Sequence, residues 1–114
     1  MKSGRYKMKL LFICNQNQYR SPTAELLFKD EYETKSAGLY SPFNQVTERQ
    51  IEWADIILVM EEEQRTELSK RFPKQYMKKR ILNLNIPDIY QYNDPALINE
   101  LKRKIKEMED DKII

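Results

Sequence analysis

Short, mostly apolar runs alternate with amphipathic stretches along this chain of 114 residues. Such runs are typical of strands that are buried on both faces of a sheet. The run DIILVM at residues 55–60 is the clearest of them, and TKSAG at 34–38 is the weakest. The pattern predicts four strands, over residues 9–14, 34–38, 55–60 and 80–86.

The stretches between these strands carry the start and stop signals of helices. Ser21 suits the N-cap of a helix whose first position is Pro22. The sequence TERQ at 47–50 fits a capping box, and three glutamates gather where the positive end of the third helix dipole favours them. The predicted helices cover residues 22–32, 47–54, 61–71 and 95–108.

Strands that alternate with helices predict an α/β fold. We expect a three-layer sandwich in which a central, mostly parallel, four-stranded sheet carries helices on both faces. At this length residues 1–114 should form a single domain, with residues 1–7 as a loosely ordered extension before the first strand. The functional crevice of such a fold lies at the carboxyl ends of its strands, and Cys14 is placed at such an end.

Composition limits the cofactors and partners of the protein. Lysine and arginine total 20 against 18 acidic residues, and the two signs are interspersed, which disfavours nucleic acid as a partner. One cysteine and no histidine allow no internal disulfide and few ligands for zinc or copper. We therefore expect no metal and no cofactor. A cytoplasmic location without membrane association is also expected, because the basic start is followed by only a short apolar run.

The loop from Cys14 to Arg20 has the properties of an anion-binding cradle. In a loop that leaves a strand and enters a helix, successive backbone N–H groups point into one concavity, and the helix dipole adds positive charge. A cysteine at the base of this cradle would be a nucleophilic thiolate. The guanidinium of Arg20 could grip two oxygens of a phosphate. The alternative is a cysteine that simply packs, inert, at the end of its strand.

The stretch from Cys14 to Pro22 resembles the C-x5-R-[S/T] signature of the low-molecular-weight protein tyrosine phosphatases. The stretches KSAG near residue 37, ILVME near residue 59 and IPDIYQYND near residue 90 resemble family segments in the same order. The resemblance covers most of residues 8–105 and implies a phosphomonoester hydrolase with a phosphocysteine intermediate. It implies a phosphotyrosine protein or a small aryl phosphomonoester as substrate, with inorganic phosphate, sulfate or vanadate as ligands.

The resemblance also assigns catalytic roles. Cys14 would be the nucleophile, Arg20 would bind the phosphate and Asp88 would act as general acid and base. Asp94 competes with Asp88 for the acid role, but its place before Pro95 and a long helix is explained by N-cap duty. The stretch IPDIYQYND resembles the general-acid segment of the family without a gap, and this alignment favours Asp88 as the acid.

Supporting roles follow from the same resemblance. Ser21 would donate a hydrogen bond to the thiolate, Asn17 would shape the loop in a left-handed conformation, and Ser36 would brace the loop from the neighbouring strand. Tyr90 would be an aromatic residue that flanks the pocket. The expected phosphate-binding residues are Asn15, Gln16, Asn17, Gln18, Tyr19, Arg20 and Ser21.

The chain departs from the family pattern in two places. Gln16 and Tyr19 stand where the family often has a glycine and a second cysteine, so no protective disulfide can form beside the nucleophile. The segment between KSAG and WADIILVM is shorter than in typical members. It lacks a stretch that helps to wall the pocket, and with it a histidine that braces the loop.

Other functions are compatible with parts of the sequence. A non-catalytic phosphate- or phosphopeptide-binding module of the same fold would keep Arg20 and the cradle, although it would require neither Cys14 nor Asp88. An arsenate reductase would need further cysteines to resolve its thiol-arsenate intermediate. Nucleic-acid binding through the basic stretch 102–106 is disfavoured, because such residues on a terminal helix usually form a solvated face. A Cys-His protease would need a histidine.

Overall fold

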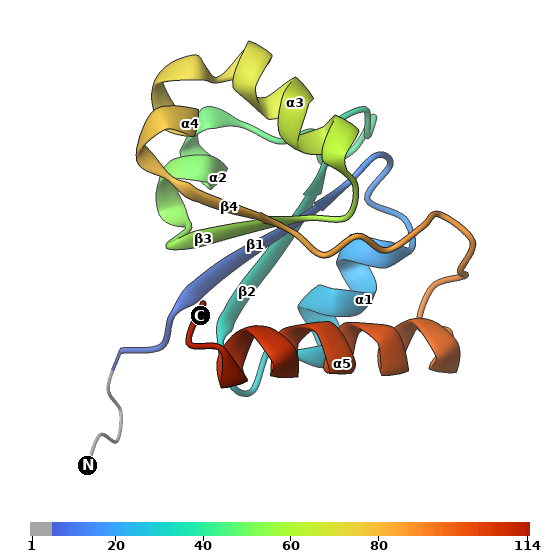
Figure 1. The fold of residues 1–114 in the computed structure, drawn as a ribbon. Helices are drawn as coiled ribbons and strands as arrows, with labels where there is room; N and C mark the ends of the chain where they lie inside the picture. The colour runs from blue at the N-terminus through green and yellow to red at the C-terminus, as the bar shows by residue number, and fades with distance from the viewer. Residues whose placement is uncertain (1–5) are drawn as a thin grey trace.

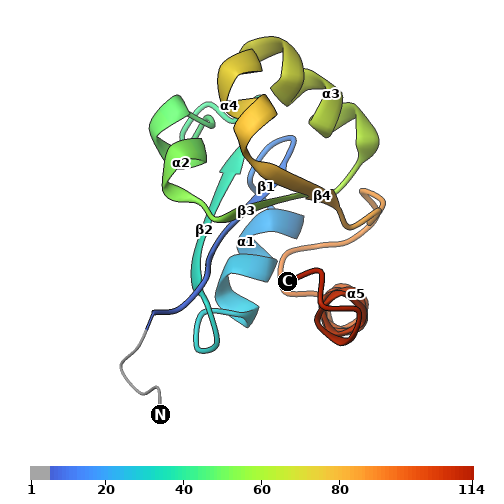
Figure 2. The ribbon, with the colours of Figure 1, turned by 60° about the vertical axis from the view of Figure 1, so that its left-hand side comes forward.

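The computed structural model describes residues 6–114, and in this part of the chain four parallel strands form one sheet in the order β2-β1-β3-β4. The strands are β1 (Lys9–Cys14), β2 (Glu33–Gly38), β3 (Ile56–Val59) and β4 (Arg80–Asn83). The helices are α1 (Arg20–Leu27), α2 (Glu48–Trp53), α3 (Glu62–Arg71), α4 (Pro73–Lys78) and α5 (Pro95–Asp110). Helices α1 and α5 cover one face of the sheet, and α2, α3 and α4 cover the other (Figure 1, Figure 2). The predicted α/β sandwich is confirmed, with a sheet that is parallel throughout.

Each face of the sheet carries its own hydrophobic core, because side chains alternate along every strand. From β1, Leu10 and Phe12 point into the core shared with α1 and α5, whereas Leu11 and Ile13 point into the core on the opposite face. Burial on both faces explains why β1 and β3 are continuous apolar runs. Cys14, the last residue of β1, lies on the side of α1 and α5.

The strand order positions the functional site. The chain moves from β1 through α1 to β2 on one side, and then crosses to β3, which pairs with β1 on its other side. The connections that leave neighbouring strands therefore diverge beside β1, and this divergence opens a crevice at the carboxyl ends of the strands. The loop of residues 15–19 lies at this crevice.

The expected N-cap at Ser21 was wrong. Helix α1 begins at Arg20, with Tyr19 in the N-cap position and without a side-chain cap, so Ser21 lies inside the first turn. Its hydroxyl is 3.0 Å from the sulfur of Cys14 and accepts a hydrogen bond from Asn17. The side chain is therefore engaged by the loop behind it and not by the helix end.

The ends of one helix and one strand differ from the prediction, and one helix was not predicted. Helix α1 ends at Leu27 and not near residue 32, because the chain must turn there to bring β2 alongside β1. Strand β4 ends at Asn83, since Asn85 adopts a positive φ of 56° that interrupts the extended backbone. Helix α4 was not predicted; it begins at Pro73, a residue that suits the first turn of a helix.

The described residues that precede β1 contact the rest of the fold. The predicted extension 1–7 lies largely outside the described residues. Within the described residues, the hydroxyl of Tyr6 donates to Asp55 and thereby lowers the pKa of that carboxyl, and Lys7 donates to the Asp30 carbonyl.

Among residues 6–114, none of the helices has the length and apolar character needed to cross a membrane.

Two helix starts match their sequence signals. Thr47 and Gln50 form the reciprocal bonds of a capping box at α2. The side chain of Asp94 accepts a hydrogen bond of 2.9 Å from the backbone N–H of Ala96 at the start of α5. Asp94 is therefore an N-cap, as predicted.

We expect Asp94→Ala to lower the free energy of unfolding by about 1 kcal/mol, because the capping bond is lost. Asp94→Asn serves as the matched control and should leave stability nearly unchanged, since asparagine caps as well as aspartate does. Urea denaturation followed by circular dichroism measures both. An equal loss in the two variants would argue that the charge of Asp94, and not its cap, stabilises α5.

Gly38 ends β2 directly beneath the loop that follows Cys14. A Cβ at this position would lie 2.8 Å from the carbonyl oxygen of Asn15, 2.9 Å from the backbone nitrogen of Asn17 and 2.9 Å from the Cβ of Ser41. Since two of these atoms are backbone, the loop itself would have to shift. We expect Gly38→Ala to lower the free energy of unfolding by about 1–3 kcal/mol in the same urea experiment. Wild-type stability would contradict the close packing of β2 under the loop.

Candidate active site

The loop that leaves β1 curves around the sulfur of Cys14 and runs into the first turn of α1. Cys14 itself is only 3% exposed. Asn17 has a φ of 57°, the left-handed conformation expected for it, and asparagine tolerates this region better than most residues. The segment that follows β2 holds the loop from one side, because the N–H of Tyr40 donates to the carbonyl of Asn15 at 2.8 Å.

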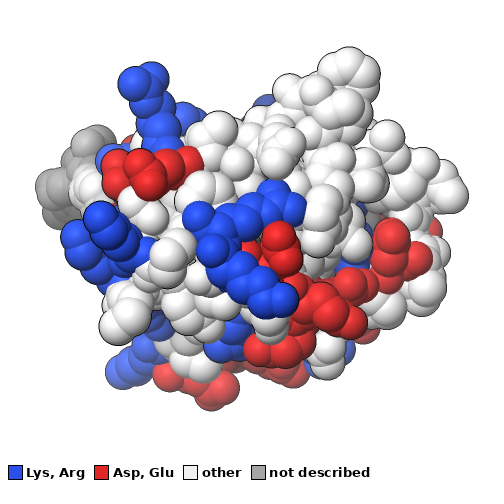
Figure 3. Space-filling model, turned by 90° about the horizontal axis from the view of Figure 1, so that it is seen from above, with Lys and Arg blue, Asp and Glu red and all other residues white. Residues whose placement is uncertain are grey.

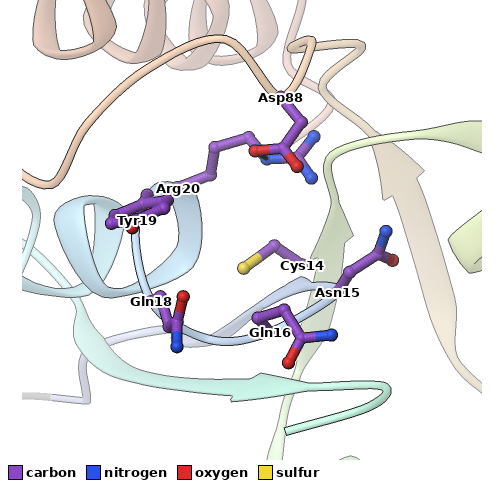
Figure 4. Close-up of a pocket in the computed structure, with 7 residues that line it drawn as sticks. All are labelled: Cys14, Asn15, Gln16, Gln18, Tyr19, Arg20 and Asp88. Atoms are coloured by element: carbon purple, nitrogen blue, oxygen red, sulfur yellow. Dashed lines mark ion pairs between the residues drawn. The ribbon is translucent and has the colours of Figure 1, made fainter.

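A cavity of about 200 Å³ opens beside Cys14. In Figure 4 the sulfur lies in the middle of this space, the side chains of the loop surround it, and Asp88 reaches over it from the connection between β4 and α5. Three residues predicted to carry the chemistry, Cys14, Arg20 and Asp88, thus border one cavity. The lining residues are Cys14, Asn15, Gln16, Gln18, Tyr19, Arg20 and Asp88.

The guanidinium of Arg20 is held in a fixed orientation. The side chain is 2% exposed, and its Nη1 donates to a carboxylate oxygen of Glu61 at 2.8 Å and to the carbonyl of Ile86 at 2.7 Å. A buried cation is tolerated only with such partners. Its Nε lies 3.7 Å from an oxygen of Asp88, whose side chain is 59% exposed. The charge of Arg20 is therefore fixed at the cavity wall, while the carboxylate of Asp88 is open to solvent.

Behind the loop, three predicted supporting residues form a hydrogen-bonded cluster. The Nδ2 of Asn17 donates to the hydroxyls of Ser21 and Ser36, both at 2.9 Å. The Ser21 oxygen is 3.0 Å from the sulfur of Cys14, within the range for a hydrogen bond to sulfur. Neither Asn17 nor Ser21 lines the cavity, so both act on the loop from the side that faces β2.

Tyr90 lies differently from the expectation. It is partly buried against the core that α1 and α5 share, and it is not among the residues that line the cavity. The aromatic ring at the cavity is instead that of Tyr19, which is 39% exposed. A flanking role for Tyr90 stays a prediction.

Sequence reasoning did not identify three side chains that hold the site. Glu61 was assigned only to the helix dipole, although it also pairs with Arg20. Gln64 is buried and donates to the side chain of Asn15 at 3.1 Å, and its spacing of three residues from Glu61 was an available capping-box signal. Asn44, in the segment between β2 and α2, donates to Asn17 at 3.0 Å. No local signal marks that contact.

The charged side chains on the face seen in Figure 3 do not form a field of one sign. Seen from above, acidic and basic side chains adjoin one another over the middle and lower part of the surface, and the upper right-hand part is mostly uncharged (Figure 3).

Comparison with known proteins places the fold. No family model and no curated protein sequence matches the chain. Among solved structures, the YwlE arginine phosphatase from Geobacillus stearothermophilus has a TM-score of 0.72 at 22% identity, covering 91% of this chain and 92% of that one. The tyrosine phosphatase Wzb from Escherichia coli K30, in complex with phosphate, has a TM-score of 0.72 at 19% identity, covering 92% and 98%.

A third structure, the low-molecular-weight protein tyrosine phosphatase from T. tengcongensis, has a TM-score of 0.73 at 21% identity and covers 91% of this chain and 99% of that one. These likenesses extend over nearly the whole of each chain. At such identities they concern the fold, and they agree with the resemblance that the sequence motifs indicate. The chain therefore has the fold of the low-molecular-weight protein tyrosine phosphatases.

Proposed function

We propose that the protein is a phosphomonoester hydrolase that works through a phosphocysteine intermediate on Cys14. The observation that carries the proposal is the cavity bordered jointly by the sulfur of Cys14, the fixed guanidinium of Arg20 and the exposed carboxylate of Asp88. A module that only binds phosphate would use the cation and the loop, but it would need neither the sulfur nor the carboxylate. Phosphatases among the structures of the same fold support the proposal.

In the first step, the thiolate of Cys14 attacks phosphorus and the bond to the leaving oxygen breaks. Because Nη1 of Arg20 is committed to Glu61 and Ile86, the edge formed by Nε and Nη2 is the one suited to grip two phosphate oxygens. Loop N–H groups stabilise the equatorial oxygens as charge redistributes. Asp88, protonated, delivers its proton to the leaving oxygen.

In the second step, water attacks the phosphocysteine and the P–S bond breaks. Asp88, now ionised, takes a proton from the attacking water, which reverses its role in the first step. The thiolate of Cys14 leaves, and the Ser21 hydroxyl 3.0 Å away stabilises its charge. Phosphate is released, and all the groups return to their starting protonation states.

We propose an aryl phosphate, either on a tyrosine of a protein or in a small molecule, as the substrate. The ring of Tyr19 at the cavity offers an apolar surface against which a phenyl group can pack. A protein phosphoarginine is the alternative that the fold relative YwlE suggests, because that relative is an arginine phosphatase. A thiolate nucleophile also suits a reducing compartment such as the cytoplasm.

The test of the proposed function is hydrolysis of phenyl phosphate by the wild type and by Cys14→Ser. We expect turnover by the wild type, competitive inhibition by orthovanadate, and a loss of about 10³-fold or more in kcat for the variant, since a serine hydroxyl is a far weaker nucleophile here. A phosphoarginine peptide assayed in parallel decides between the two substrate classes. Binding of orthovanadate without any turnover would indicate the non-catalytic module.

The role of Asp88 is tested by the leaving group. Asp88→Asn should slow phenyl phosphate by roughly 10²-fold or more, but should slow 4-nitrophenyl phosphate much less, because a more acidic phenol needs little protonation. Asp94→Asn is the matched control and should change neither rate. If Asp94→Asn abolishes turnover of phenyl phosphate while Asp88→Asn remains active, the two assignments must be exchanged.

A further inference from the structure

A continuous series of hydrogen-bonded side chains runs behind the loop, from the start of α2 to the nucleophile. We call Gln50, Asn44, Asn17 and Ser21 the polar relay. Gln50 donates to Asn44 at 3.1 Å, Asn44 donates to Asn17 at 3.0 Å, and Asn17 donates to Ser21 at 2.9 Å. Ser21 in turn lies 3.0 Å from the sulfur of Cys14. Gln50 lies in α2, and Asn44 lies in the segment between β2 and α2.

The orientation of the Asn44 amide is dictated by its surroundings. One of its two terminal atoms lies 2.6 Å from the carbonyl oxygen of Ser36, which can only accept, so this atom must be the nitrogen. The oxygen of Asn44 then faces the Nε2 of Gln50. Gln50 is oriented in the same way, because its own oxygen accepts the backbone N–H of Thr47 at 2.8 Å in the capping box.

Asn44 thereby determines the orientation of Asn17. Because Asn44 donates an N–H to Asn17, the side-chain oxygen of Asn17 must accept it. The side-chain nitrogen of Asn17 therefore points toward Ser21 and Ser36 and donates to both. Ser36 accepts this N–H and donates its proton to Glu25 at 2.5 Å. The amide of Asn17 consequently has no freedom to reverse.

The direction of the relay decides where the Ser21 proton points. The Ser21 oxygen already accepts from Asn17, so its single proton is available for another partner. The two candidates are the sulfur of Cys14 at 3.0 Å and the carbonyl of Ala37 at 3.4 Å, and the sulfur is nearer. A thiolate gains more from such a bond than a neutral acceptor does.

We propose that Asn44 is a positioning residue that sets the direction of the polar relay, so that Ser21 donates its proton to the sulfur of Cys14. Asn44 is not among the residues that line the cavity, and its connection to the sulfur runs through Asn17 and Ser21. The catalytic consequence rests on the proposed function, whereas the effect on the sulfur can be measured without turnover. Asn44 thus supplies, from a short connection in a chain without histidine, the bracing that the loop requires.

The variant Asn44→Asp has nearly the same shape but presents only acceptors. Asn17 should then turn its nitrogen toward Asp and its oxygen toward Ser21, which draws the Ser21 proton away from the sulfur. Asn99→Asp makes the same chemical change at an exposed position of α5 and is the matched control. Asn44→His keeps an N–H donor and tests rescue. Asn44→Ala removes the donor without adding an acceptor. It replaces Asn44→Asp in the measurement if Asn44→Asp fails to fold.

The readout is the rate at which iodoacetamide alkylates the folded protein at pH 7, measured by mass, with Cys14 the single thiol in the chain. We expect about a ten-fold slower rate in Asn44→Asp, a smaller loss in Asn44→Ala, and wild-type rates in Asn99→Asp and Asn44→His. A purely structural defect would instead expose Cys14 and speed the reaction. With phenyl phosphate, kcat should fall about as much as the alkylation rate, and KM should change less.

The Ser21→Ala background separates the relay from a simple charge effect. If Asn44 acts through Ser21, Asn44→Asp should cause no further slowing when Ser21 is already alanine. The inference is overturned if Asn44→Asp and Asn44→Ala are alkylated at the rate of the control, or if the slowing persists in the Ser21→Ala background. Absence of wild-type turnover would remove the proposed function, and the alkylation rates would still decide the role of Asn44.

Discussion

The guanidinium of Arg20 is almost completely withdrawn from water, and the remainder of the site is arranged around this fact. Such a cation is costly unless acceptors surround it. Glu61 at the start of α3 and the carbonyl of Ile86 beyond β4 are these acceptors. The requirement ties the first helix to the segments that follow β3 and β4, so the strand order and the position of the loop after Cys14 depend on each other.

The loop is supported on two sides by different kinds of contact. On the side of α3, Arg20 is fixed by charge, and Gln64 fixes the side chain of Asn15 while also capping its own helix. On the side of β2, support comes from neutral amides and hydroxyls that cluster around Asn17. Negative charge directly beside the sulfur would oppose a thiolate, whereas oriented amides and hydroxyls can donate to it; the carboxylate of Glu25 on this side accepts from Ser36. This division suits the function proposed for the site, in which an anionic sulfur would lie next to an anionic ligand.

The position of Asp88 differs in kind from that of the other site residues. Its side chain is open to solvent and lies on the connection between β4 and α5, whereas Cys14 and Arg20 are anchored at the ends of regular elements. A group that must exchange protons with substrate and water needs such access. A group that must stabilise charge needs rigidity instead. The fold places Cys14 at the end of a strand and Asp88 on a loop, which suits the roles proposed for them.

Local signals in the sequence were enough for the elements and for part of the site. The apolar run of β1, the capping box at Thr47 and the N-cap at Asp94 each depend on residues a few positions apart, so the sequence alone determined them. The spacing of Cys14 and Arg20 is local in the same way. That Asp88 lines the same cavity as these two residues could be expected only from the resemblance to the phosphatase family, because no local sequence signal links residue 20 with residue 88.

Contacts between distant segments were decided by the tertiary structure alone. Ser21 carried the signal of an N-cap, but the loop engages its hydroxyl from behind. Glu61 and Arg20 are 41 positions apart, and Asn44 and Asn17 are 27 apart, so no periodicity could reveal these pairs. The sequence by itself determined most of the strands and helices and where Cys14 and Arg20 stand along the chain. Which polar groups satisfy that cation and orient the loop was decided by packing, because a buried hydrogen-bonding group takes whichever partner the fold brings to it.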